Sequence, residues 1–380
     1  MPDFDFAATV VGGGVIGLAI LHKLAARNID AVLLERHPAC GRETSSRNSE
    51  VVHGGMYYAP GSLKARLCVS GRRQLYRFAE EHGVSHRRSG KVIVAVDDGE
   101  IAGLEKILAT GRQNDVEELR LLAPGEVEAI APGVRAAAAL YSPVTGTVNA
   151  HHFMDALRHN AERDGAMVVC GAEVDGLTPV AGGWEIRYRD ADGPSTVRSR
   201  AVINAAGLRA QHVMSLAGLD PVANGLRLYP CKGNYFSVGG ESRKRIHGLV
   251  YPAPEANLAG LGIHTIVDFD GGVKLGPNVE YVEEAGEYDY RVDEELRGVF
   301  FASASRYLPF LREEDIQPDM SGVRPKLSGP GMPARDFYIA HEEARGLARF
   351  INLAGMESPG LTACLAVGDM VAEMTAGILS

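Results

Sequence analysis

Three closely spaced glycines and one glutamate near the N-terminus have types and spacing that suit a specific chemistry. Gly12, Gly14 and Gly17 follow the pattern G-x-G-x-x-G, and Glu35 lies further along the chain. In such a motif the first glycine permits a tight turn, the second lets a pyrophosphate approach the backbone, and the third lets a helix pack against a strand. A carboxylate at Glu35 can accept hydrogen bonds from both hydroxyls of an adenosine ribose. The glycine pattern alone is a weak signal, because a glycine-rich turn in an unrelated α/β domain also produces it.

The elements needed to position these residues are predicted around them. Residues 7–11 are apolar and partly β-branched, which is typical of a buried parallel strand. Residues 15–28 predict a helix with an apolar face, and residues 29–34 predict a second strand that ends at Glu35. The N-terminus of the helix offers unpaired N–H groups and the positive end of a dipole to phosphates. Strand, helix, strand and terminal acid together predict dinucleotide binding.

Composition limits the class of protein and of partner. A chain of 380 residues can bury a large core and is long enough for about two domains. Its 46% hydrophobic and 23% charged residues are ordinary for a globular protein. The formal net charge of −9 argues against a nucleic acid partner. An anionic substrate must therefore be attracted by local positive charge.

The sequence predicts a cytoplasmic protein without a transmembrane segment, either free or peripheral to the inner membrane. The N-terminal segment carries Asp3 and Asp5 and lacks the basic start of a signal peptide. The apolar C-terminal stretch is interrupted by Asp369 and Glu373, which argues against a membrane span. Five scattered cysteines without a C-x-x-C pair indicate reduced thiols and no metal site.

Nucleotide-domain patterns recur in three separated parts of the chain, with β-rich segments between them. The predicted fold class is therefore α/β with α+β insertions, in which a discontinuous Rossmann-like domain meets a β-rich substrate domain at a ligand cleft. The G-x-G-x-x-G pattern occurs once, which favours a single tightly held dinucleotide that the substrate itself reduces. The predicted boundaries are 1–86, 148–226 and 322–380 for the nucleotide domain, and 87–147 and 227–321 for the substrate domain.

Three passages carry a family resemblance. They are NSEVVHGGMYY at 48–58 with PGSLKA at 60–65, LGIH at 261–264, and LGPN at 275–278. Through them the chain resembles, over essentially its whole length, the FAD-dependent oxidoreductases of the D-amino-acid oxidase and glycine oxidase superfamily. Within it the chain is most similar to L-2-hydroxyglutarate dehydrogenases. The resemblance implies FAD as the dinucleotide, a small anionic 2-hydroxy acid as substrate, and a quinone, an electron carrier or oxygen as electron acceptor.

The resemblance also implies which residues contact FAD. Residues 44–46 match a loop near the flavin phosphates and ring, and Val174 matches a residue whose backbone touches adenine. Residues 205–207 match a small-residue stretch against the dinucleotide, and residues 355–361 match a loop at the pyrimidine edge of the isoalloxazine. A helix that begins at residue 360 would stabilise negative charge there, unless this is an ordinary loop-to-helix turn. The full set implied is Gly12, Gly14, Val15, Ile16, Gly17, Glu35, Arg36, Thr44, Ser45, Ser46, Asn48, Ser49, Val174, Ala205, Ala206, Gly207, Gly355, Met356, Glu357, Ser358, Pro359, Gly360 and Leu361.

The chain departs from the hydroxyglutarate family at positions that bear on the substrate. Ser46 and Arg47 stand where that family usually has a Gly-His pair, and Glu50 stands where it usually has glycine. A Glu50 side chain facing the cleft would repel a second substrate carboxylate. The segment 357–362 is more similar to the amine-oxidising relatives.

His53 follows an apolar strand and precedes two glycines, where the resemblance places the flavin. A neutral imidazole with a pKa near the working pH suits removal of a hydroxyl proton while the C2 hydride passes to flavin N5. Two alternatives stay open for His53. It is either a structural histidine hydrogen-bonded at the domain boundary or a site of covalent flavin attachment.

Further polar residues are candidates for the substrate side. Arg324, within GVRP, matches the superfamily arginine that grips a carboxylate bidentately, with a surface ion pair as the alternative. Lys232 is a candidate partner for a second carboxylate or for negative charge on the flavin, with a solvated lysine as the alternative. His264 alternates with apolar neighbours, so it faces either the substrate or a core. Tyr57 and Tyr58 are expected on opposite faces of a strand, so that at most one lines the cleft.

The leading hypothesis is an FAD-dependent dehydrogenase that oxidises an L-2-hydroxy acid, with L-2-hydroxyglutarate as the best candidate. The first alternative is an oxidase or dehydrogenase of a small amine or amino acid, of glycine or sarcosine type, which the C-terminal loop favours. The second alternative is a flavin-binding protein without turnover.

Overall fold

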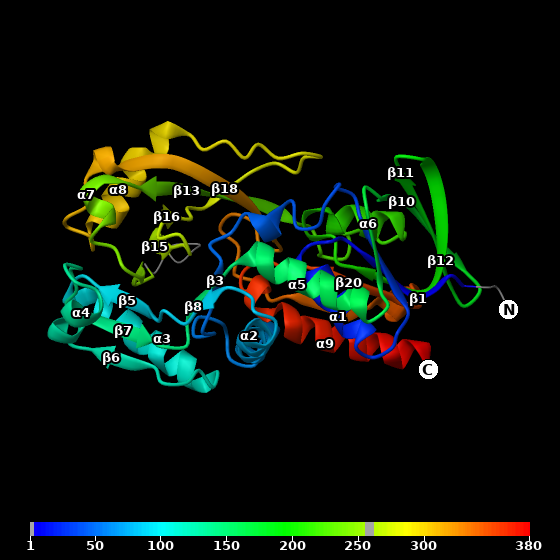
Figure 1. Ribbon diagram of the computed structural model, residues 1–380, viewed down its shortest axis with the longest axis horizontal. Coiled ribbons are helices and arrows are strands. Elements are labelled where there is room, and N and C mark those ends of the chain that lie inside the picture. The colour runs from blue at the N-terminus through cyan, green and yellow to red at the C-terminus, as the bar shows by residue number, and fades with distance from the viewer. Residues whose placement is uncertain (1–3, 255–261) are drawn as a thin grey trace.

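The fold is described for residues 4–254 and 262–380 of a computed structural model (Figure 1). Leu261, the first residue of one family-like passage, lies outside these ranges. So do residues 1–3 of the predicted nucleotide domain.

An eight-stranded sheet forms the end of the molecule where both termini lie (Figure 1). Its strands are β1 (Phe6–Val11), β2 (Ala31–Glu35), β9 (Met167–Cys170), β10 (Glu173–Val180), β11 (Gly183–Asp190), β12 (Gly193–Asn204), β19 (Tyr338–His341) and β20 (Phe350–Ala354). The C-terminal half of β12 lies between β1 and β20, and these strands, with β2 and β9, are parallel. The N-terminal half of β12 pairs antiparallel with β11, and β11 pairs with β10. This parallel core confirms the predicted Rossmann-like fold class.

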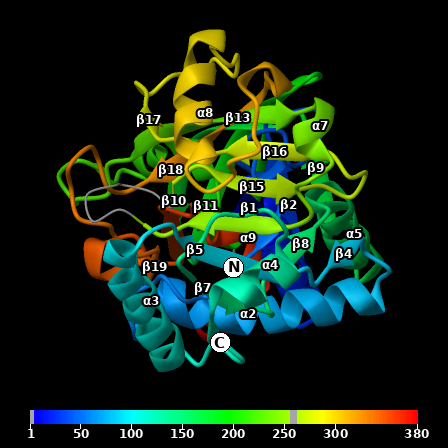
Figure 2. The same ribbon diagram turned by 90° about the vertical axis from the view of Figure 1, so that its left-hand side faces the viewer.

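Three further sheets extend from it toward the other end of the molecule. The first sheet contains β13 (Tyr229–Val238), β15 (His264–Val267), β16 (Val273–Gly276), β17 (Glu280–Tyr281) and β18 (Ile316–Lys326). The second sheet contains β5 (Lys91–Ala95), β6 (Arg120–Leu122), β7 (Ala138–Ser142) and β14 (Leu249–Pro252). The third sheet contains β3 (Val51–Val52), β4 (His86–Arg87) and β8 (Gly146–Val148). In Figure 2, which looks onto this end, the first sheet lies above the second. Because β5 pairs in parallel with β14, the two inserted segments of the chain build one sheet together.

Strand β18 alters one predicted boundary. It runs without interruption through the predicted division at 321/322 and pairs along its length with β13. The predicted division at 321/322 therefore falls within a continuous strand, and Arg324 and Lys326 lie in the same sheet as β13.

Helices cover the sheets. They are α1 (Val15–Ala25), α2 (Leu63–Glu81), α3 (Ile101–Gln113), α4 (Pro124–Ile130), α5 (Ala150–Arg163), α6 (Ala210–Leu216), α7 (Gly240–Arg243), α8 (Arg297–Ser305) and α9 (Gly360–Leu379). Helix α1 contacts α5 and α9, and α2 also contacts α9. Their buried side chains share one hydrophobic core with β1 and β2.

Two helices begin at N-cap residues that can be recognised in the sequence. Serine is a favoured N-cap residue, and Ser62 predicts a helix that begins directly after it. The Ser62 hydroxyl accepts a hydrogen bond from Ala65 N at 3.1 Å, and α2 begins at the next residue, which confirms this prediction. Asn149 caps α5 in the same way. The sequence of residues 294–311 predicts one helix, but residues 294–296 form a 3-10 turn and α8 ends at Ser305. Pro309 disfavours helical backbone in the residue before it, so the helix does not continue to 311.

Helix α9 is long and apolar enough to cross a membrane by length and composition, in spite of Asp369 and Glu373. The sequence-based reason for excluding a span is therefore wrong. However, 56% of its most apolar window is buried inside the fold. The Asp369 carboxylate also lies 3.3 Å from Lys23 Nζ and 3.4 Å from Arg27 Nη2. Helix α9 is therefore packed as a core helix of the fold, and the charge of Asp369 is paired.

Candidate active site

One cavity begins where the parallel strands end and extends to the substrate-domain sheets. Gly12 follows β1, Glu35 ends β2, Ala205 follows β12 and Met356 lies just beyond β20, and all four residues line the cavity. Ligands of parallel α/β sheets bind at this carboxyl edge. The residues implied to contact FAD line the cavity with three exceptions, which are Gly17, Ser46 and Gly355.

The glycines of the motif stand where side chains would collide with backbone. Gly12 has a φ of +108°, and a Cβ there would lie 2.7 Å from the Ala205 carbonyl oxygen. A Cβ on Gly17 would lie 1.9 Å from the Gly12 carbonyl oxygen, so Gly17 serves the close packing of α1 rather than the cavity wall. A Cβ on Gly14 would lie 3.0 Å from Ser45 Oγ. The motif therefore keeps the helix start bare for a ligand.

We expect Gly12→Val to purify colourless, because the left-handed φ and the contact with Ala205 both exclude a β-branched side chain. The measurement is the ratio of flavin to protein absorbance after purification. Gly286→Val is the control, because Gly286 is exposed and a Cβ there meets no atom within 4 Å. Full FAD content in Gly12→Val would contradict the assignment of this motif.

Glu35 and Ser45 shape the nucleotide end of the cavity. The two carboxylate oxygens of Glu35 accept hydrogen bonds from Gly13 N at 2.6 Å and His37 N at 2.8 Å. These bonds hold the carboxylate at the cavity wall, where its remaining lone pairs can accept from ribose hydroxyls. Ser45 Oγ accepts from Val15 N at 2.9 Å, which joins the loop to the start of α1.

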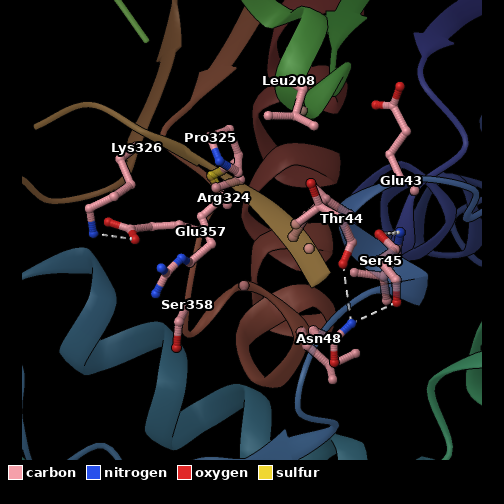
Figure 3. Close-up of a pocket in the computed structure, with 18 of the residues that line it drawn as sticks. Glu43, Thr44, Ser45, Asn48, Leu208, Arg324, Pro325, Lys326, Glu357 and Ser358 are labelled. Carbon is pink, nitrogen blue, oxygen red and sulfur yellow. Dashed lines mark hydrogen bonds and ion pairs between the residues drawn. The ribbon is translucent and has the colours of Figure 1, made fainter. Parts of the chain in front are cut away.

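Asn48 holds the same loop from below (Figure 3). Its Nδ2 donates to the carbonyl oxygens of Thr44 at 3.2 Å and Ser45 at 2.8 Å. The Thr44 hydroxyl donates to the Val323 carbonyl oxygen at 2.8 Å, so the loop is tied to β18. Ser46 faces away from the cavity wall, and its hydroxyl donates to the Glu43 carbonyl oxygen at 3.2 Å.

Two lysines enclose Glu357 in the C-terminal loop. The carboxylate lies 3.0 Å from Lys64 Nζ and 2.7 Å from Lys326 Nζ, as Figure 3 shows for the second pair. Burial alone would raise the pKa of Glu357, but the two ammonium groups outweigh it and hold that pKa below its usual value. This triad lines the cavity and leaves it one net positive charge.

His53 lies buried at the cavity wall. Its Nε2 is 3.2 Å from Ser358 Oγ, its backbone N–H donates to Thr362 Oγ1 at 3.0 Å, and its Nδ1 is buried without a hydrogen-bond partner in the described ranges. Burial, together with the charge of Lys91, lowers the pKa of His53 to about 3. The imidazole is therefore neutral at physiological pH and able to accept a proton.

His264 lies in β15 and also lines the cavity. Its ring stacks on Tyr251, with centroids 3.7 Å apart and ring planes at 8°. Burial is the main cause that lowers the pKa of His264 well below its ordinary value. The two predicted alternatives, a core histidine and a histidine that faces the substrate, both hold in part, because His264 is buried and also lines the cavity.

Arg324 reaches the cavity from β18 with its guanidinium fixed by main-chain oxygens. Its Nε donates to the Cys231 carbonyl oxygen at 3.3 Å, and its Nη2 donates to the carbonyl oxygens of Lys232 at 3.2 Å and Asn278 at 2.8 Å. Within residues 4–254 and 262–380 it makes no ion pair with a carboxylate, so the surface ion pair considered above is absent there. An oriented cation without an anion suits a substrate carboxylate.

Lys232 does not line the cavity. Alternate residues of a strand point to opposite faces, and its neighbours Gly233 and Tyr235 line the cavity. The Lys232 ammonium instead donates to the Arg291 carbonyl oxygen at 2.6 Å. This position does not support the predicted role as a partner of a second carboxylate or of negative charge on the flavin, and the side chain is buried rather than solvated.

Glu50 also faces away from the cavity. Its carboxylate accepts a hydrogen bond from Ala150 N at 2.7 Å, at the start of α5, and its φ is +57°. This left-handed backbone is one that glycine adopts readily. Glu50 therefore does not repel an anion in the cavity.

Both tyrosines of the family-like passage line the cavity, which contradicts the expectation that at most one does. Tyr57 and Tyr58 lie in a turn beyond β3 rather than in a strand, so their side chains do not alternate. Tyr235, Lys64 and Lys326 also line the cavity, although no sequence pattern predicted them there. The signal available for Lys326 was its position two residues beyond Arg324, which places both on one face of a strand.

The sequence matches the family described as FAD dependent oxidoreductase over residues 8–374. The chain belongs to this family. The L-2-hydroxyglutarate dehydrogenase, mitochondrial, of Arabidopsis thaliana is 36% identical over 96% of this chain and 82% of the relative. The human protein of the same name is 28% identical over 97% of this chain and 88% of the relative.

Solved structures share the fold of this FAD-dependent oxidoreductase. L-alpha-glycerophosphate oxidase from Mycoplasma pneumoniae, with FAD bound, has a TM-score of 0.84 at 24% identity, covering 98% of this chain and 94% of that one. Glycine oxidase from Geobacillus kaustophilus has a TM-score of 0.78 at 22% identity, covering 98% and 95% of the two chains.

FAD is the cofactor, and the cavity fits it. Gly14 provides no side-chain cap for α1. Apart from Val15 N, which donates to Ser45 Oγ, the N–H groups of the first turn can therefore bind the pyrophosphate. Glu35 would hold the ribose, and the loops at 44–49 and 355–361 would hold the flavin. In the part of the chain that the structure describes, no group of His, Cys, Asp and Glu side chains could hold a metal ion.

Proposed function

We propose that this FAD-dependent oxidoreductase is a dehydrogenase of an L-2-hydroxy acid, with L-2-hydroxyglutarate as substrate and 2-oxoglutarate as product. The observation that carries the proposal is the position of His53 and Arg324 on the same cavity as the nucleotide motif. The names of the relatives that match nearly the whole chain support the choice of substrate.

Each residue has a defined task in this proposal. Arg324 binds the C1 carboxylate and thereby orients C2, because its guanidinium plane is fixed by carbonyl oxygens. His53 accepts the hydroxyl proton as the C2–O double bond forms. The substrate carboxylate brings negative charge close to His53, which raises the pKa of the imidazole from its low value in the free site. FAD, when bound, supplies the acceptor for the C2 hydride.

The second carboxylate of the substrate needs a cation other than Lys232. Lys326 lies two residues beyond Arg324 on the same face of β18, and both line the cavity. Its ammonium shares Glu357 with Lys64, so the triad retains one positive charge for an anion. Lys326 is therefore the proposed partner of the C5 carboxylate.

We expect L-2-hydroxyglutarate to bleach the flavin absorbance of the anaerobic holoenzyme, and its D-enantiomer to leave it unchanged. Lactate should react more slowly, because it has no second carboxylate to bind. The measurement is a panel that adds glycine and sarcosine to these three compounds. Bleaching by glycine or sarcosine alone would transfer the enzyme to the amine-oxidising class, and bleaching by none would favour a flavin-binding protein without turnover.

A further inference from the structure

Lys91, the first residue of β5, carries a buried ammonium that no carboxylate reaches in the described ranges. Only 1% of the residue is exposed, and its Nζ has no hydrogen-bond partner there. Burial of an unpaired charge is strongly unfavourable in a protein interior. A lysine kept in this position therefore needs compensation from its surroundings or from a ligand.

Two aromatic rings provide part of that compensation. The Nζ atom lies 4.6 Å from the ring centroid of Tyr57 and 4.4 Å from that of Tyr251. Electron-rich ring faces attract a cation, and more strongly so when water is excluded. Tyr57 lines the cavity, and Tyr251 stacks on His264, which also lines it. The charge of Lys91 therefore lies directly behind one wall of the cavity.

The other titratable groups of this wall do not change charge near neutral pH. Burial lowers the pKa of His53 to about 3 and that of His264 well below its ordinary value. Burial raises the pKa of the Cys68 thiol to about 12 and keeps the phenols of Tyr57 and Tyr251 neutral by raising their pKa values.

Two cationic side chains belong to this part of the site. Arg324 lines the cavity, and Lys91 lies behind the wall. Burial lowers the pKa of Lys91 to about 7. Among the described titratable groups of this wall, Lys91 is therefore the one whose charge changes near neutral pH.

We propose that Lys91 is a positioning residue that places a positive charge, only partly compensated by the two rings, behind the Tyr57 and His264 wall, so that an anionic substrate binds together with a proton held on Lys91. The proposal rests on the proposed function in one respect, the anionic class of the substrate. A bound anion stabilises the charged form of Lys91, and by linkage affinity for the anion falls as pH rises and Lys91 loses its proton.

The test is the pH dependence of anion binding to the FAD-loaded enzyme, read from the perturbation of flavin absorbance without turnover. The probes are 2-oxoglutarate and propionate, titrated from about pH 6 to about pH 9, a range that spans the expected transition. For the wild type we expect affinity to fall about tenfold across this range, and the loss to be centred at or above neutral pH.

The variants give three distinct profiles. Lys91→Met should bind both probes weakly, and its affinity for each probe should not change with pH, because the variant has no charge at this position and keeps only an apolar side chain. Lys91→Arg should bind them with little pH dependence, because its charge persists. Lys106→Met is the matched control on exposed α3 surface and should behave as wild type. Lys91→Gln provides a second uncharged variant if Lys91→Met does not fold.

A purely structural role predicts a different result. With a purely structural role, Lys91→Met would bind each probe more weakly by the same factor at every pH, and its affinity would still fall with rising pH as steeply as that of the wild type. That outcome would overturn the proposal. The test is separable from the proposed function, because propionate carries no hydroxyl group and no turnover is needed. Failure of L-2-hydroxyglutarate to reduce the flavin would remove the proposed function and leave the Lys91 measurement to be decided on its own.

Discussion

His53→Ala is expected to retain FAD and to slow flavin reduction by L-2-hydroxyglutarate by about 10²-fold or more, the usual loss for a general base. The physical reason is that the neutral His53 imidazole lies on the cavity wall, hydrogen-bonded to Ser358, while the tyrosines of this wall are protonated and donate rather than accept. The measurement is stopped-flow absorbance at saturating substrate. An unchanged rate would make His53 a structural residue.

The matched control is His151→Ala, because His151 is exposed near the start of α5 and does not line the cavity. It should reduce flavin at the wild-type rate. Acid precipitation of the wild type and of His53→Ala tests the remaining alternative, covalent attachment of the flavin. Flavin that stays with wild-type precipitate and is released from His53→Ala would instead identify His53 as a site of covalent attachment.

Arg324→Lys is expected to lower kcat/KM roughly 10- to 100-fold for every 2-hydroxy acid, the scale of a lost charge-assisted hydrogen bond. A lysine has the charge but not the planar fork that orients a carboxylate, and it cannot satisfy the carbonyl oxygens of Cys231 and Asn278 together. The measurement is steady-state kinetics with L-2-hydroxyglutarate and with 2-hydroxybutyrate.

Lys326→Met separates the two carboxylate positions. It should impair L-2-hydroxyglutarate far more than 2-hydroxybutyrate, which has no second carboxylate, whereas Arg324→Lys should impair both alike. Arg291→Lys is the surface control, since its side chain is 90% exposed. Equal effects of Arg324→Lys and Arg291→Lys would contradict the assignment of Arg324.

The parts of this site that sequence predicts well depend on local geometry. Gly12 and Glu35 are separated by one helix and one strand, so their spacing alone determines that they meet at one sheet edge. Ser62 and Asn149 each accept a hydrogen bond from the amide three residues further on, and both helix starts are predicted from these residue types. Arg324 was recognised through its family-like sequence rather than through geometry.

The parts that sequence misjudged depend on which face of an element meets the cavity. Lys232 and Gly233 are neighbours in β13, but only Gly233 lines the cavity, and nothing local identifies the inward face of a strand buried on both sides. Tyr57 and Tyr58 were misplaced because an apolar run that predicts a strand continues as a turn. Lys91 gave no signal at all, because its two aromatic partners come from distant segments.

The most direct test of the account is anaerobic titration of the FAD-loaded enzyme with L-2-hydroxyglutarate, followed by flavin absorbance and by assay of the keto acid formed. A two-electron transfer from C2 predicts that one equivalent of substrate bleaches one equivalent of FAD and yields one equivalent of 2-oxoglutarate. Unbleached flavin with excess L-2-hydroxyglutarate, or bleaching without 2-oxoglutarate, would contradict the central claim that this cavity oxidises an L-2-hydroxy acid.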